Sequence, residues 1–232
     1  MVQKKAVNDG KQVDEFMSKK NKQKNIKASY SCFEAKYRGW ISPVKIIRRW
    51  RRNIKHAYQR IRYGYCDRDV WSIDWWFLNV VPNMLQDLRK TAHGFPSEVG
   101  DMVGYDGQNI DKSKEQEAID KWDSILAEIV FYLREANEET CQKKKPFEEQ
   151  YDADWHEFDV KYAGGEKLKT AEEKTEEKKK GLHRIYIPSD LPEYRDTADQ
   201  FIDEERRLNA YRDECKNKGL ELFSKWFWNL WD

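Results

Sequence analysis

Two aspartates, Asp67 and Asp69, stand at the start of a predicted helix, and Asp74 follows them. Carboxylates this close together suit a divalent cation or an acid-base pair. An aspartate at a helix N-terminus also accepts hydrogen bonds from free backbone N–H groups and offsets the helix dipole, which is its more common use. We therefore favour capping over metal binding for these residues.

A second set of carboxylates lies at helical spacing in the middle of the chain: Glu117, Asp120, Asp123 and Glu128. All-α nucleotide pyrophosphohydrolases hold magnesium between helices that carry such spacings, so this enzyme class is the main catalytic alternative. An adjacent glutamate pair is absent upstream, and Glu204 and Glu205 lie downstream in a helix that is charged throughout. The weak candidate metal ligands on this hypothesis are Asp67, Asp69, Glu117 and Asp120.

Nucleophilic and phosphate-cradling motifs are missing from the sequence. Its four histidines show neither HxxxH nor HExxH spacing, and its four cysteines include no CxxC pair. Neither GxGxxG nor GxxxxGK[ST] occurs. A catalytic triad and ATP-driven chemistry are thus disfavoured, no cofactor is predicted, and a non-enzymatic role is preferred.

Basic residues form the most site-like feature of the chain. They interleave with Trp50 and Tyr58 in one short segment, and the candidate phosphate- or nucleic-acid-binding residues are Arg48, Arg49, Arg51, Arg52, Lys55 and Arg62. Guanidinium groups bind phosphate through planar, bidentate contacts. Such a helix suits a nucleic-acid backbone, an anionic membrane surface or an acidic face of its own protein, and composition alone leaves all three open.

The charge distribution frames that choice. Residues 1–62 hold 18 Lys or Arg against 4 Asp or Glu, whereas residues 63–232 hold 25 against 38. The two regions must attract each other or bind separate partners. Weak, sequence-independent phosphate binding by the basic helix is our hypothesis, with contact to the acidic part of the chain as its alternative.

Four helices must position these residues. The periodicity of apolar residues predicts these helices near 43–62, 69–92, 114–139 and 197–230. Ser42 and Pro43 suit the start of the first helix and Gly64 its end, while Pro82 should kink or split the second. Gly219 marks a possible interruption of the last. The expected core residues are Trp71, Trp76, Trp122, Leu126, Leu133, Phe223, Trp226 and Leu230.

The predicted architecture is an all-α irregular helical bundle with a basic arm and a polar insertion. The arm covers 1–40, the first part of the bundle 41–140, the insertion 141–188, and the C-terminal helix that completes the bundle 189–232. Within the insertion, RIYIP at 184–188 has the composition of a short strand. No apolar run approaches the length of a membrane span, and the scattered cysteines and missing signal peptide favour a reducing, cytoplasmic location.

Four phrases together resemble an uncharacterised family of short, mostly helical tailed-bacteriophage proteins. They are RYGYCDRDVWSIDW at 62–75, which includes a DxDxW pattern, HGFP at 93–96, WDSILAEIVFYLR at 122–134 and GLELFSKWFWNLWD at 219–232. The resemblance implies a viral gene expressed in the cytoplasm of a bacterial host, and it transfers no functional residue.

The resulting functional hypothesis is a non-enzymatic phage accessory protein. It would bind a host or phage partner, or a phosphate-bearing ligand such as nucleic acid or nucleotide. The alternatives are the magnesium-dependent nucleotide pyrophosphohydrolase and a structural component of the virion.

Overall fold

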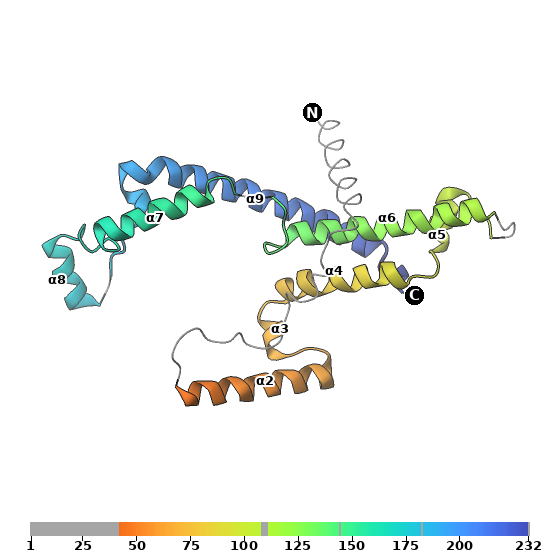
Figure 1. Cartoon of the computed structure of the whole chain (residues 1–232), viewed down its shortest axis with the longest axis horizontal. Helices are drawn as coiled ribbons and strands as arrows, with labels where there is room; N and C mark the ends of the chain where they lie inside the picture. Colours follow the sequence, from red (N-terminus) through yellow and green to blue (C-terminus); the bar gives the residue numbers. More distant parts are fainter. Residues whose placement is uncertain (1–41, 108–110, 144, 182, 232) are drawn as a thin grey trace. The chain divides into compact units, whose positions relative to one another are not determined.

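The computed structural model describes residues 42–107, 111–143, 145–181 and 183–231. Over these residues the chain forms eight α-helices, α2 to α9, two short 3-10 helices and no strand (Figure 1). The predicted all-α class is confirmed. The predicted basic arm at 1–40 lies outside the described residues.

The chain divides into two compact units. One combines the described residues up to Cys141 with those from Glu214 onward, and the other comprises 142–213. Helix α9 (Pro192–Lys225) belongs to both, because the division falls within it.

Helix α6 (Lys112–Ala136) is central to the first unit. It packs against α4 (Ile73–Thr91) and α5 (Ser97–Val103). The Trp122 ring of α6 also meets the Trp226 ring edge-on, with 5.4 Å between centroids. The buried core contains Leu85, Val99, Trp122, Ile125, Leu126, Ile129, Val130, Leu133 and Trp226.

Most of the predicted core residues do pack there. Trp122, Leu126, Leu133 and Trp226 are buried, and Phe223 and Leu230 are partly buried against them. The prediction for Trp71 is wrong, because its side chain is 91% exposed. Helix α3 (Asp67–Trp71) ends at this residue, and the backbone at Ser72 leaves the helical conformation before α4 begins. The break directs Trp71 away from the face that α4 buries.

Proline and glycine interrupt the helices less than expected. Helix α4 continues through Pro82 as one element, so the predicted split does not occur. Gly219 likewise lies within the continuous helix α9. A Cβ atom at Gly219 would lie 3.0 Å from Leu133 Cδ2 and 3.2 Å from Tyr132 Cβ, so the missing side chain permits close approach of α9 to α6.

An ion pair adds a directional link between α4 and α6. Arg89 donates from Nε and Nη2 to the two carboxylate oxygens of Asp123, at 2.8 and 2.9 Å. The Arg89 side chain is only 5% exposed. Two parallel hydrogen bonds to a buried guanidinium hold the two helices in one register.

The second unit contains α7 (Glu148–Tyr162), α8 (Ala171–Lys180), the 3-10 helix η2 (Pro188–Asp190) and the first part of α9. Its apolar contacts are aromatic: Tyr151 stacks on Phe201 with 4.1 Å between centroids, and the fully buried Phe158 meets Tyr194 edge-on. The segment 184–187 is not a strand, contrary to its composition, and Pro188 begins η2.

Candidate functional site

Helix α2 (Pro43–Tyr63) carries all six candidate phosphate-binding residues. Pro43 suits the first turn because its fixed φ is helical and its missing N–H would be unpaired there anyway. Gly64 ends the helix in the left-handed conformation, and its N–H donates to the Arg60 carbonyl at 2.9 Å. Ser42 begins the helix through its backbone carbonyl, and its side chain makes no capping hydrogen bond.

The six basic residues differ in exposure. Arg48, Arg51, Lys55 and Arg62 are exposed, whereas Arg49 and Arg52 are half-buried. Lys55 Nζ donates to Asp67 Oδ2 at 2.7 Å. Arg48 and Arg51 form no ion pair with the described residues around them. Together with Arg62 they present positive charge to solvent along the length of α2.

The neighbouring helix α3 neutralises one side of α2. Arg60 donates to both carboxylate oxygens of Asp69, at 2.6 and 3.0 Å. The Cys66 N–H donates to Asp69 at 2.8 Å, and since Cys66 is the N-cap of α3 and Asp69 its third residue, this contact is the carboxylate half of a capping box. The hydrogen bond from Lys55, and to a lesser extent the one from Gln59, lowers the pKa of Asp67 below its usual value. Both aspartates are therefore used as anionic partners for α2.

The carboxylates considered for magnesium do not converge. Glu117 and Asp120 lie on the exposed side of α6, and Asp120 accepts from Gln116 Nε2 at 3.1 Å. Asp67 and Asp69 are engaged by α2, and Asp123 by Arg89. Across the described part of the chain, no three His, Cys, Asp or Glu side chains are grouped as metal ligands would be.

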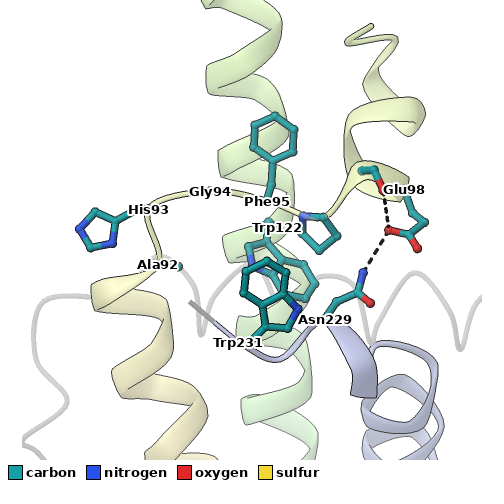
Figure 2. A pocket seen from close by; sticks show the side chains of 10 residues that line it. Ala92, His93, Gly94, Phe95, Glu98, Trp122, Asn229 and Trp231 are labelled. Atoms are coloured by element: carbon teal, nitrogen blue, oxygen red, sulfur yellow. Dashed lines mark hydrogen bonds between the residues drawn. The ribbon is translucent and has the colours of Figure 1, made fainter. Parts of the chain in front are cut away.

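A pocket of about 380 Å³ lies in the first unit where the HGFP turn meets the end of the chain (Figure 2). Its aromatic walls are Phe95, Trp122 and Trp231. Glu98 supplies a carboxylate, which accepts from Asn229 Nδ2 at 3.0 Å and Ser97 Oγ at 3.3 Å.

Glu98 is the only Asp, Glu, Lys or Arg among the residues that line this pocket. The backbone N–H of Glu98 itself and the Asn229 amide lower the pKa of Glu98, so the carboxylate is ionised at neutral pH. Aromatic walls beside one anionic group suit a small cationic or polar guest. Glycine and proline follow His93 in the sequence and favour a turn there, but the sequence does not show the convergence of Glu98 with Asn229.

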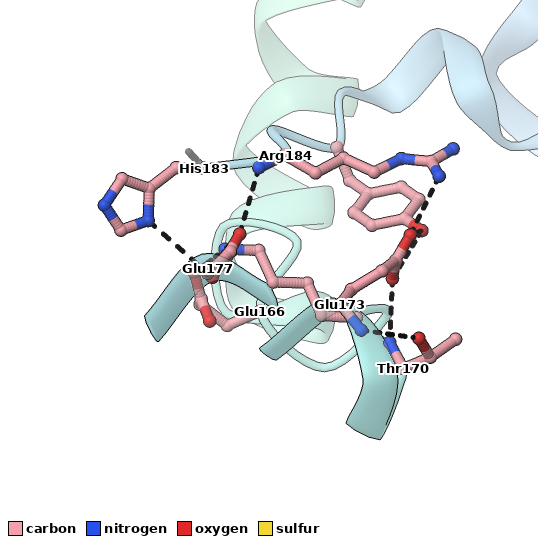
Figure 3. Close-up of polar contacts among 8 residues, drawn as sticks. Glu166, Thr170, Glu173, Glu177, His183 and Arg184 are labelled. Carbon is pink, nitrogen blue, oxygen red and sulfur yellow. Dashed lines mark hydrogen bonds and ion pairs between the residues drawn. The ribbon is translucent and has the colours of Figure 1, made fainter. Parts of the chain in front are cut away.

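A cluster of charged residues in the second unit has a structural role (Figure 3). Lys169 pairs with Glu166 at 2.6 Å and Glu177 at 2.8 Å, and Arg184 pairs with Glu173 at 2.8 Å. The Arg184 N–H also donates to Glu177. Each of these carboxylates has a cationic partner, and the contacts of Arg184 attach the segment after α8 to that helix.

Comparison of the chain with protein-family models, with curated proteins and with solved structures finds no match.

Proposed function

We propose that this protein is a non-enzymatic binding protein whose helix α2 holds the phosphate groups of a larger partner. The observation that carries the proposal is the charge of α2, which contains eight Lys or Arg and no Asp or Glu. Arg48, Arg51 and Arg62 present that charge to solvent. Exposed guanidinium groups with no carboxylate bound to them are available for bidentate contacts to phosphate oxygens.

Two features support binding rather than catalysis. The carboxylates proposed for a magnesium-dependent hydrolase either pair with cations or point to solvent from α6. The pocket beside Glu98 offers an anionic group and aromatic walls. Ser97 is the only Ser, Cys or Lys among its lining residues, and its hydroxyl donates a hydrogen bond to the Glu98 carboxylate. Experiments should therefore identify what α2 binds.

The biological setting belongs to the same proposal. The phrases at 62–75, 93–96, 122–134 and 219–232 support a phage accessory protein that acts in the cytoplasm of a bacterial host. A structural role in the virion would instead place the protein in purified particles, which mass spectrometry of those particles would detect.

Binding to polyanions tests the proposal. Fluorescence anisotropy with duplex and single-stranded DNA, and flotation with vesicles that contain phosphatidylglycerol, cover the main phosphate-bearing surfaces. We expect the affinity for at least one of them to fall steeply with salt. For a nucleic acid, each lost contact lowers the log-log salt slope by about 0.7–0.9.

The variant for this test replaces the exposed residues Arg48 and Arg51 together by Gln. The matched control replaces Arg206 and Arg207 of α9 by Gln, because both side chains are 75% exposed and also belong to a highly charged helix. The proposal requires that only the α2 variant weakens binding. Absence of binding to every probe at low salt, or equal loss in both variants, would rule it out.

A further inference from the structure

Helix α2 exposes an apolar stripe together with its cations. Five large side chains at three- and four-residue steps occupy one face: Ile47, Trp50, Ile54, Tyr58 and Ile61. Residues at these steps lie above one another on a helix. Their exposed fractions run from 61% to 87%, which is unusual for a continuous row of large apolar side chains.

A stripe of cations runs beside the apolar one. Arg48, Arg51, Lys55 and Arg62 are separated by three, four and seven residues, so they follow the same helical face over its whole length. Lys55 in this row pairs with Asp67, so the three arginines carry its net charge. At 100° per residue, this row borders the apolar row on the side of Tyr58. The exposed surface of α2 is thus half apolar and half cationic.

The opposite side of α2 attaches the helix to its own unit. His56 is buried, and Arg60 binds Asp69 of α3. On the helical wheel His56 lies roughly opposite Ile54 and Ile61, and Arg60 is turned away from both by about 100° or more. The contacts with α3 therefore leave the apolar stripe facing outward.

We infer that the partner of α2 is an anionic lipid surface, on which the helix lies flat. This inference rests on the proposed function, because the arginines that hold phosphate are the same ones. A bilayer interface accepts apolar side chains about 5–10 Å into the boundary between headgroups and acyl chains, while its phosphates receive the flanking cations. The cations extend from Lys45 to Arg62, along the whole helix, so the helix lies in the plane of the surface.

The other candidate occupants match only one of the two stripes. A nucleic-acid backbone binds the arginines and leaves the apolar row in water. A second copy of α2 would cover the apolar row but bring eight cations against eight. Residues 1–41 hold ten Lys or Arg against four Asp or Glu, so their charge also opposes α2. Anionic lipid satisfies both stripes at once.

Vesicle flotation of the full-length protein tests the inference. Neutral phosphatidylcholine vesicles are compared with vesicles that also contain phosphatidylglycerol, at low and high salt. We expect binding to the anionic vesicles only, weakened by salt. Replacing Arg48 and Arg51 by Gln should weaken binding about fivefold per residue, or roughly 25-fold in total.

The apolar stripe is tested by replacing Ile54 and Ile61 with Gln, which keeps the helix and removes the apolar contact. We expect a loss of about tenfold or more per residue. The matched control is Val160→Gln with Ile185→Gln, since both residues are exposed apolar side chains outside α2. Circular dichroism of each variant should match that of the parent protein, because the replaced side chains are all exposed.

Each other outcome overturns the inference in a distinguishable way. DNA binding that persists in the Ile→Gln variant, with no vesicle binding, would sink the lipid inference and leave the proposed phosphate-binding function standing. No binding to DNA or vesicles would remove both. A dimer in light scattering that dissociates in the Ile→Gln variant would identify a second copy as the occupant. Equal binding to neutral vesicles would remove the role of the arginines.

Discussion

The bidentate ion pair between Arg89 and Asp123 links α4 to α6 through a nearly buried guanidinium group. Truncation of Asp123 leaves the nearly buried Arg89 guanidinium without its carboxylate. Burial and the nearby Arg89 charge already lower the pKa of Arg134, so a second uncompensated cation would lie close to the first. The site therefore depends on the Asp123 charge rather than on its volume.

We predict that Asp123→Ala lowers the free energy of unfolding of the first unit by about 2 kcal/mol, less than the ~3–5 kcal/mol of a fully buried pair because Asp123 is partly exposed. Urea denaturation monitored by tryptophan fluorescence reports mainly on the first unit, because the second unit, 142–213, contains a single tryptophan, Trp155. The control is Asp120→Ala on the exposed side of the same helix, which should change stability by less than about 0.5 kcal/mol. Similar losses in both variants would contradict the assigned role of the pair.

At the element scale, the junction of α6 and α9 depends on the absence of a side chain at Gly219. A Cβ there already lies at the limit of contact with Leu133 and Tyr132, and a branched side chain would exceed it. We predict that Gly219→Val lowers the free energy of unfolding by about 1–3 kcal/mol, because overpacking forces the two helices apart.

Asn217→Val is the control for that substitution, because residue 217 is exposed on the same helix and receives the same side chain, whose helical propensity is close to that of asparagine and slightly better than that of glycine. The difference between the two midpoints of thermal unfolding isolates the packing effect. If Gly219→Val were as stable as the control, α9 would not approach α6 as closely as described.

At the scale of the whole molecule, each unit has its own buried cluster. Phe158 anchors the second unit, where it contacts Trp155, Tyr162 and Tyr194. The large apolar cluster around α6 belongs to the first unit. Since the two clusters share no residue, the units should open with different free energies.

We predict that Phe158→Ala accelerates amide exchange in 148–162 and 192–213 much more than in 112–136. Loss of a buried phenylalanine typically costs about 3–5 kcal/mol, and the cavity lies within the second unit only. Hydrogen exchange with mass spectrometry measures both regions in one experiment, with the exposed Val160→Ala as control. Equal acceleration in the core of α6 would mean that the chain unfolds as one cooperative body.

The helical class and the approximate positions of the four longest helices, α2, α4, α6 and α9, could be predicted from the sequence. Periodic apolar residues, the proline at the start of α2 and the glycine at its end act within one or two turns, so a linear pattern contains them. The same holds for Trp122, Leu126 and Leu133, which share one face of α6 and form its core.

Which apolar faces are covered depends on contacts between distant segments. The rows on α2 and α6 have the same periodicity, yet the α6 row is buried and the α2 row is exposed. Trp71 is exposed because helix α3 ends there, before Ser72. The Glu98 carboxylate accepts a hydrogen bond from Asn229, which lies 131 residues further along the sequence. Periodicity predicts that one face of a helix is apolar. Which element packs on that face depends on contacts between segments far apart in the sequence, and a local pattern contains no information about them.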